Sequence, residues 1–570
     1  MHTASAAFLD ALNEAGVSHI FANFGSDHPP IIERLAEART TGEKMPKVIT
    51  CPSEMVALSA AHGFAQVTGQ AQVVLVHVEC GTQSLAGAVH NAARGRIPVL
   101  IFAGASPFTQ EGELPGTRNE HIHWLQDVFD QRGLVRGYVK YENELRTGKN
   151  IKQLVFRALQ FAHSDPRGPV YLVGAREVME EAVEPQSVDP AQFPRLSTPA
   201  LAPDDVATIV DALVRARRPL VVTSYLGRSA AAVEQLVALC ERLAIGVHES
   251  VPNYVNFPSD HPLYQDNQWN EPEQSRALAE ADTVLVLDSD VPWIAVVNKP
   301  RADALIFHID ADPLKQQMPL FYIGARRSIR ADSAVALRQL NDHLAGTKID
   351  EQAVTERRAH YAAQHEARRQ RLLAREGLTG NVLTPAYLTA QVRRRLDDNT
   401  IVLNEGITNY HTIVDHLASR RAGAMIASGA GSLGWNGGAA IGVKLARPDK
   451  TVVALTGDGS YLFSIPSAVH WMARKYETPF VQIVYNNGGW RAPRLSTLSV
   501  HPHGFASKTR DLGLSFDPSP DYAGIAAAAG GALARTVRHP AELDEALDAA
   551  FDAVRRQGRA AVVDVVLPST

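Results

Sequence analysis

Residues 451–460 read TVVALTGDGS, an apolar run that ends in an aspartate between two glycines. The β-branched residues before the glycines predict a buried strand. Residues 465–475 predict a helix, and residues 480–485, FVQIVY, predict the next strand, which Asn486 and Asn487 follow. Asp458 and Asn487 are therefore expected at the carboxyl ends of neighbouring parallel strands, where open α/β sheets hold their ligands.

The residue types at this sheet edge suit a hard cation that is bound by protein oxygen atoms and by a phosphate together. Mg²⁺ prefers oxygen ligands and is usually held by carboxylates together with phosphate groups, so Asp458 and Asn487 are the candidate metal ligands. Gly457 and Gly459 let the backbone approach a bound group closely, and Ser460 begins the next helix beside the phosphate. The alternative is a turn without metal, since Gly-Asp-Gly is a common turn sequence.

The composition is that of an ordinary soluble protein and favours neither nucleic acid nor a membrane as partner. The chain has 570 residues, 45% of them hydrophobic and 21% charged, and a net charge of −5. Three cysteines, far apart and without a CxxC pair, indicate neither zinc nor a disulfide framework. No apolar stretch reaches the length of a membrane span, and the first residues lack a signal-peptide pattern. We therefore expect a cytoplasmic protein.

Strand and helix patterns alternate in three segments, which predicts three α/β domains, each with a doubly wound parallel sheet. The expected domains are residues 1–185, 203–345 and 377–570. A proline-rich stretch, EPQSVDPAQFPRLSTPALAP at 184–203, predicts a linker, and a charged helical run at 350–376 predicts a surface connection. The expected strands in the first two domains are residues 19–23, 48–50, 73–77, 99–103, 219–224, 283–288 and 304–309.

The third segment resembles the signature of thiamin-diphosphate enzymes, in which GDG is followed about thirty residues later by NN. Three α/β units with this signature in the last resemble the pyruvate-decarboxylase and acetolactate-synthase superfamily over the whole chain. The resemblance implies thiamin diphosphate and Mg²⁺ as cofactors, the first domain binding the aminopyrimidine and the third the diphosphate. It also implies an active site between the first domain of one subunit and the third of another. A homodimer is then the minimum and a homotetramer the expected assembly.

Glu54 is the predicted catalytic acid, and it also belongs to the cofactor-binding residues. It lies in CPSEMVA, residues 51–57, which resembles the glutamate segment of the family. The family uses this carboxylate on N1′ of the pyrimidine to promote the tautomer that removes the C2 proton. A carboxylate in this role must be desolvated and carry a proton. The alternative is an ordinary carboxylate that the helix macrodipole stabilises.

Two further segments resemble the loops that hold the cofactor in this family. Thr408, in LNEGIT at 403–408, would give a hydroxyl to a phosphate oxygen, or would simply begin a helix. The segment SGAGSLGWNGGAAIGV, residues 428–443, resembles the family's GGLG segment. By that resemblance Leu433 forces the two thiamin rings into their V shape, and the carbonyl of Gly431 accepts a hydrogen bond from the 4′-amino group. Gly489 would give a backbone carbonyl to the metal.

The substrate side is predicted from two segments of the first domain that resemble benzoylformate decarboxylase. Ser26, in FANFGSDH at 21–28, matches a serine that meets the substrate carboxylate there. His77, in VLVHVECGTQ, matches a histidine that transfers protons, a role that suits an imidazole near neutral pH. His28 is a lesser candidate. The alternative for a lone histidine at a strand end is a structural role.

Other residues are placed near the site by their position alone. Trp490 and Arg491 directly follow the metal loop, so they would roof the pocket, and Trp490 is grouped with the cofactor-binding residues; the alternative is that it only packs. His121 and His123 lie where relatives bring a loop toward the neighbouring active site. The stretch DSDVPWIAVVNK, residues 288–299, has Trp293 but no histidine where benzoylformate decarboxylase has a second catalytic one.

The expected function is a lyase that acts on a 2-oxo acid. The C2 carbanion of the cofactor would add to the keto carbon, and loss of CO₂ would leave an enamine. Protonation gives an aldehyde (decarboxylase), whereas attack on a second carbonyl gives an acyloin (carboligase). The substrate partner is thus a small 2-oxo acid or aldehyde.

Several alternatives stay open. One is an acetolactate-synthase-like ligase or flavin-containing relative, although VVTSYLGRSAAA, residues 221–232, lacks the glycine-rich run that approaches FAD, which weighs against FAD. Another is a 2-hydroxyacyl-CoA or oxalyl-CoA-type lyase, with Arg228, Lys299 and Arg301 as possible nucleotide contacts. A third, a non-catalytic subunit that binds the cofactor, would need no proton-relay acid such as Glu54.

Overall fold

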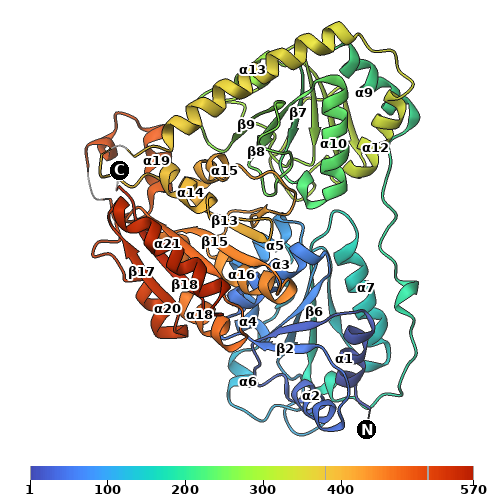
Figure 1. Ribbon diagram of the computed structural model, residues 1–570. Coiled ribbons are helices and arrows are strands. Elements are labelled where there is room, and N and C mark those ends of the chain that lie inside the picture. The colour runs from blue at the N-terminus through green and yellow to red at the C-terminus, as the bar shows by residue number, and fades with distance from the viewer. Residues whose placement is uncertain (1, 379, 510–511, 569–570) are drawn as a thin grey trace.

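The protein folds into three parallel sheets of six strands each, and helices cover the faces of each sheet (Figure 1). The structure is a computed structural model that describes residues 2–378, 380–509 and 512–568. The predicted fold class, three doubly wound α/β domains, is confirmed. Among the described residues, no helix has the length and apolar character needed to cross a bilayer.

The first sheet has the strand order β2-β1-β3-β4-β6-β5. Its strands are β1 (His19–Ala22), β2 (Lys47–Thr50), β3 (Gln72–Val76), β4 (Val99–Ala105), β5 (Glu142–Leu145) and β6 (Pro169–Ala175). The helices around it are α1 (Ala4–Glu14), α2 (Pro29–Thr41), α3 (Glu54–Thr68), α4 (Val78–Ser84), α5 (Ala86–Arg94), α6 (Ile122–Leu125), α7 (Ile151–His163) and α8 (Arg176–Met179).

The middle sheet has the order β12-β11-β10-β7-β8-β9. Its strands are β7 (Pro219–Thr223), β8 (Gly246–Ser250), β9 (Tyr264–Gln268), β10 (Thr283–Leu287), β11 (Leu305–Asp310) and β12 (Arg327–Arg330). Its helices are α9 (Pro203–Arg215), α10 (Ala230–Leu243), α11 (Arg276–Glu280) and α12 (Ser333–Leu344), and the long helix α13 (Glu351–Arg375) runs from this domain to the third (Figure 1).

The third sheet has the order β14-β13-β15-β16-β18-β17. Its strands are β13 (Thr400–Glu405), β14 (Met425–Ile426), β15 (Thr451–Gly457), β16 (Val481–Asn486), β17 (Leu533–Val537) and β18 (Ala561–Val566). Its helices are α14 (Pro385–Arg393), α15 (Tyr410–Leu417), α16 (Trp435–Ala446), α17 (Asp458–Phe463), α18 (Pro466–Lys475), α19 (Arg491–Val500), α20 (Tyr522–Gly530) and α21 (Pro540–Arg555).

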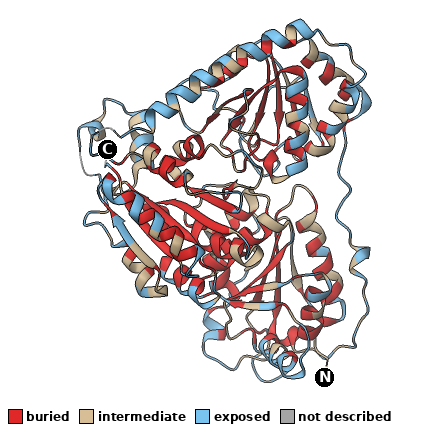
Figure 2. Ribbon diagram, viewed as in Figure 1, coloured by how far each residue is buried: buried red, intermediate tan, exposed pale blue. Residues whose placement is uncertain are grey.

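The central strands are buried along their whole length, as Figure 2 shows for all three sheets. Parallel strands covered by helices on both faces read as continuous apolar runs rather than as alternating patterns. This explains why the strand predictions differ from the observed strands by one or two residues only. The domain boundaries 1–185, 203–345 and 377–570 stay a prediction, with one sheet inside each.

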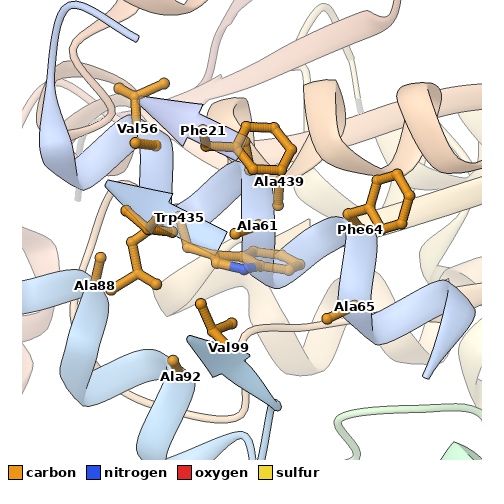
Figure 3. Packing of buried hydrophobic residues seen from close by; sticks show 14 of the residues in the cluster. Phe21, Val56, Ala61, Phe64, Ala65, Ala88, Ala92, Val99, Trp435 and Ala439 are labelled. Carbon is orange, nitrogen blue, oxygen red and sulfur yellow. The ribbon is translucent and has the colours of Figure 1, made fainter. Parts of the chain in front are cut away.

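Helices α3 and α16 join the first and third domains in one core. Trp435 and Ala439 of α16 lie among Ala61 and Phe64 of α3 and apolar residues of α5 and β4 (Figure 3). A Cβ on Gly442 would lie 1.8 Å from the carbonyl oxygen of Ala60, so the two backbones approach as closely as glycine allows. The segments that begin with Glu54 and with Trp435 are therefore fixed relative to each other.

Candidate active site

Asp458 connects the two loops at the carboxyl edge of the third sheet. It is the first residue of α17, directly after β15, and is 3% exposed. Its carboxylate accepts hydrogen bonds from the backbone N–H groups of Gly459, Gly488 and Gly489, each at 2.9 Å. Burial raises the pKa of Asp458, and the three N–H groups oppose that shift. The acid thus fixes the turn after β16 against the start of α17.

Three polar side chains at this edge have capacity for a ligand. Ser460 Oγ and Asn487 Oδ1 are buried and have no hydrogen-bond partner among the described residues. Asn487 Nδ2 donates to Thr408 Oγ1 at 3.4 Å, a long bond. Buried polar groups without partners are costly unless a ligand, ion or water satisfies them. The site therefore fits a bound diphosphate and its metal ion, with an amide oxygen and a carboxylate as metal ligands.

Gly489 and Trp490 shape the roof of this edge. Gly489 has φ +150°, a conformation that favours glycine, and its carbonyl accepts from the N–H of Arg491 at 3.0 Å, which leaves one lone pair for a metal. Trp490 packs edge-on to Phe463 and Phe516, with ring centroids 5.7 and 5.0 Å away. A Cβ on Gly459 would lie 2.3 Å from the Trp490 ring, so this tryptophan packs directly against the turn that contains Gly459.

The described residues contain no group of three or more His, Cys, Asp and Glu side chains able to hold a metal ion. A metal at Asp458 and Asn487 would therefore depend on one acid, one amide and a backbone carbonyl, together with phosphate oxygens. Mg²⁺ uses such a sparse protein ligand set when a substrate or cofactor phosphate completes it.

The loop that carries Gly431 and Leu433 is held from two sides. Asn91 of α5 accepts from the N–H of Ser432 at 3.1 Å and donates to its carbonyl at 2.8 Å. Gly431 is exposed with open space at its Cα, and Leu433 is half-buried. The first domain thus positions the segment that the resemblance assigns to the thiamin rings.

Glu405 holds the other side of this loop, a role that the sequence did not reveal. Its carboxylate accepts from the backbone N–H groups of Gly434, Trp435 and Asn436 at 2.8, 3.1 and 2.9 Å. It therefore caps the N-terminus of α16 with a negative charge. Burial raises the pKa of Glu405 to about 7, against the effect of those three bonds. The only feature of the sequence that pointed to this role of Glu405 is the presence of a charged residue at the end of the apolar strand β13.

Glu54 lies at the start of α3 and is half-buried. Its Oε1 accepts a hydrogen bond from Asn23 Nδ2 at 2.7 Å, and a Cβ on Gly81 would lie 3.2 Å from the same oxygen. Asn23 follows β1, and its side chain fixes the carboxylate from a strand that is 31 residues away in sequence. The second carboxylate oxygen stays available for a ligand, and the acid is held in one orientation.

His77, Asp27 and His28 form one cluster at the carboxyl ends of β1 and β3. His77 bonds through Nδ1 to Asp27 Oδ1 at 2.6 Å and through Nε2 to Gln126 Oε1 at 2.9 Å. The hydrogen bond to Asp27 raises the pKa of His77. Burial opposes the ionisation of Asp27, but the charges and bonds of His28 and His77 lower its pKa.

His28 lies behind this pair and is fully buried. Its Nδ1 accepts from the N–H of Gly25 at 3.0 Å and lies 3.1 Å from Asp27 Oδ1, and burial lowers the pKa of His28. Asp27 and Gln126, which the sequence reading did not single out, complete the cluster around His77.

Ser26 lies beside His123 in the same chain. Ser26 Oγ and His123 Nε2 are 3.2 Å apart, and Arg176 donates to the carbonyl of Ser26 at 3.0 Å. His123 is fully buried, whereas His121 is exposed. Helix α6 thus brings His123 against Ser26 of the same subunit, and Gln126, which contacts His77, directly follows this helix.

The carboxyl edge of the middle sheet is occupied by its own charged residues. Asp310 pairs with Arg96 of the first domain at 2.9 Å and with Lys315 at 2.6 Å, and Asp290 pairs with the same two cations at 2.9 and 2.8 Å. Arg96 also lies over the Tyr225 ring, 4.4 Å from its centroid. These cations are therefore not free to bind a nucleotide phosphate.

The fold and the site define an enzyme that depends on a cofactor and is built from three α/β domains. Family models of thiamine pyrophosphate enzymes match all three: the N-terminal TPP-binding domain at residues 2–134, the central domain at 206–340 and the C-terminal TPP-binding domain at 406–565. The chain therefore belongs to the thiamine pyrophosphate (thiamin diphosphate) enzyme family.

Relatives with different activities are similar to the chain at about the same level. It is 25% identical to sulfoacetaldehyde acetyltransferase of Rhodobacter capsulatus, over 99% of this chain and 94% of the relative. It is also 25% identical to benzoylformate decarboxylase of Pseudomonas aeruginosa, over 87% and 88% of the two chains. The 4-hydroxybenzoylformate decarboxylase of Rhodococcus jostii has the same fold, with a TM-score of 0.77, 22% identity, and 100% and 99% of the two chains covered.

Proposed function

We propose that the protein is a thiamin-diphosphate- and Mg²⁺-dependent lyase that decarboxylates a small 2-oxo acid, or transfers the resulting acyl unit to an aldehyde. The observation that carries this proposal is the pairing of His77 with Asp27, close to a separately held Glu54. The hydrogen bond to Asp27 raises the pKa of His77 and so favours a protonated imidazole at the carboxyl edge of the first sheet. Such a group can deliver the proton that turns the acyl unit into an aldehyde.

The cofactor, when bound, supplies the carbanion and takes up the electrons left by the departing CO₂. Asp458, Asn487 and the carbonyl of Gly489 would hold the metal, and Ser460 and Thr408 would contact the diphosphate. The unpartnered oxygens of Ser460 and Asn487 support this assignment. Gly457 and Gly459 would bring the backbone close to the same group.

Glu54 would bind the pyrimidine of the cofactor, fixed by the hydrogen bond from Asn23. Leu433 and the carbonyl of Gly431 would hold the two rings, on a loop that Asn91 and Glu405 position. We further propose an active site that two subunits share, in a homodimer at minimum and a homotetramer as the working assembly.

Ser26 would bind the substrate carboxylate with the help of His123. The two side chains are within hydrogen-bond distance, and Arg176 fixes the backbone that carries Ser26. His77, paired with Asp27, would transfer the proton. The protein thus binds the acid through one pair of residues and moves protons through another.

The nucleotide-dependent alternatives have weaker support. Three basic residues were considered for CoA. Arg228 pairs with Asp165 at 3.1 Å and lies 3.7 Å from Asp288, Arg301 forms a bidentate pair with Asp303, and Lys299 is exposed. Because Arg228 and Arg301 are already paired with carboxylates, these two residues provide little attraction for a CoA diphosphate. Acetolactate-type ligation would use the same cofactor site. It is therefore included in the proposal as the carboligase reaction, in which the acyl unit is transferred to a second carbonyl compound.

The proposal is tested by an assay of the protein reconstituted with thiamin diphosphate and Mg²⁺. Pyruvate, benzoylformate, and branched and phenyl-bearing 2-oxo acids are offered with and without an aldehyde acceptor, while CO₂ and organic products are measured together. We expect CO₂ and an aldehyde or acyloin from at least one acid. His77→Ala should lose most turnover, whereas the matched control His121→Ala, at an exposed histidine, should not. Absence of CO₂ from every acid would refute the proposal.

A further inference from the structure

A cavity of about 240 Å³ lies between the middle and third domains. It is bounded by residues that follow β8 and β10, by the segment after β13 and by the loop at 427–432 that includes Gly431. The two segments from the third domain are those assigned to the cofactor. The cavity therefore adjoins the reacting centre from the side of the middle domain.

The walls of this cavity are mostly apolar, although serine and asparagine side chains also belong to the lining. Val251, Trp269, Val291, Ile407 and Tyr410 contribute their side chains to the lining. Trp269 and Tyr410 form a continuous aromatic wall, because their ring centroids are 4.6 Å apart. The wall is anchored, since the hydroxyl of Tyr410 donates to the carbonyl of Pro252 at 2.6 Å.

The charged side chains of the lining have partners elsewhere. Asp290 is held by Arg96 and Lys315, and Glu405 by the N–H groups at the start of α16. No lysine, arginine or histidine lines the cavity among the described residues. A ligand with a charged end would find no opposite charge here, so the cavity selects against anionic and cationic side chains.

Two residues of the lining have a strained backbone conformation, which is typical of functional sites rather than of ordinary packing. Val251 has φ +48° and Ile407 has φ +49°, and both are β-branched. Positive φ is unusual for a branched residue, and such strain persists only where the surrounding structure imposes it. The strain places both side chains at this cavity, on opposite domains.

We propose that this cavity binds the side chain of the 2-oxo acid substrate and selects an uncharged apolar group, a phenyl ring or a branched aliphatic chain. The inference rests on the proposed function, which it deepens by naming the substrate class. The size agrees, because an apolar cavity of roughly 150 Å³ is enough for benzene. A sulfonate or a guanidinium on the side chain is excluded by the absence of a free countercharge.

Val291→Phe tests the proposal from the middle-domain side. Val291 is 44% exposed and its backbone carbonyl accepts from Ser250 Oγ at 2.6 Å, so the larger side chain can fill the cavity while the loop stays anchored. We expect KM for phenyl-bearing 2-oxo acids to rise at least about tenfold relative to KM for pyruvate. The matched control is Val296→Phe, in the same loop but 91% exposed and outside the lining. Equal effects on both acids, or none, would overturn the inference.

A binding measurement separates this inference from the proposed function. Phenylacetate has no keto group and cannot react, and acetate is its small control. We expect phenylacetate, unlike acetate, to quench tryptophan fluorescence saturably in the wild type. The quenching should be lost in Trp269→Phe and weakened in Val291→Phe. If no 2-oxo acid is turned over but this pattern holds, the cavity assignment stands and the reaction is wrong. Binding that Val291→Phe does not weaken, or no binding, removes the cavity assignment alone.

Discussion

Substitution Gly442→Ala should separate the two helices that connect the cofactor's binding domains. The new Cβ would lie 1.8 Å from the carbonyl oxygen of Ala60 and 2.9 Å from the N–H nitrogen of Phe64. Non-bonded heavy atoms need roughly 3.5 Å, so α3 and α16 must move apart by about 1 Å or more. The obstacle is backbone, which cannot rotate away. Overpacking of this kind costs about 1–3 kcal/mol, and a shift of about 1 Å at the site costs about 10²-fold in rate.

The matched control is Gly437→Ala, also in α16. Its Cβ would meet Val469 methyl groups at 3.0 and 3.1 Å, and a side chain can yield by the small amount required. Both substitutions gain the same helix propensity, about 1 kcal/mol, so the difference between them reports the collision alone. Urea unfolding and kcat with the best 2-oxo acid are the measurements. Equal stability and equal turnover in the two variants would refute the reasoning that this helix contact sets the site.

The remaining predictions concern single groups. Glu54→Gln should keep the fold and thiamin diphosphate binding but lose about 10²–10⁴ in turnover, and near-native turnover would contradict the proton-relay role. Asp458→Ala should weaken Mg²⁺-dependent cofactor retention in equilibrium dialysis by more than about 100-fold; unchanged retention would exclude the metal assignment. Asp27→Asn removes the negative charge of the hydrogen-bond partner that raises the pKa of His77, so the loss of activity with rising pH should begin at a lower pH; an unmoved profile would refute the pairing. Arg96→Met leaves the buried Asp310 with one partner fewer, so the free energy of unfolding measured in urea should fall by about 3–5 kcal/mol. The control Arg301→Met, at an exposed arginine, should leave the urea midpoint unchanged. Equal midpoints in the two variants would count against the stabilising role of the Arg96–Asp310 pair.

The sequence predicted the fold well because its strongest signals are local. The strand before Asp458 is a continuous apolar run, and the observed strand is Thr451–Gly457. Glycines and asparagines that follow such strands can be recognised as a candidate binding site from the local sequence alone, without knowledge of the fold. Asp458 and Asn487 could therefore be placed at one edge, where the structure joins their loops through Gly488 and Gly489.

The supporting residues could not be predicted, because their partners are distant in the sequence. Asn23 meets Glu54 across 31 residues, and Asp27 and Gln126 reach His77 across 50 and 49. Those distances depend on the register of β1 against β3, which no local pattern contains. Glu405 was missed for the same reason, since the helix that it caps begins about thirty residues later.

The ion pairs of Arg96 have a consequence for the integrity of the chain. The linker at 184–203 between the first two domains is mostly exposed, with Arg195 and Leu196 open to proteases. Arg96 is joined to Asp290 and Asp310 beyond that linker, so the connection between the two domains is also made in space. We therefore expect a chain cut at Arg195 to keep its two fragments together without a covalent bond. Continuity of the backbone would then be dispensable at this point, and two fragments produced separately should assemble by complementation.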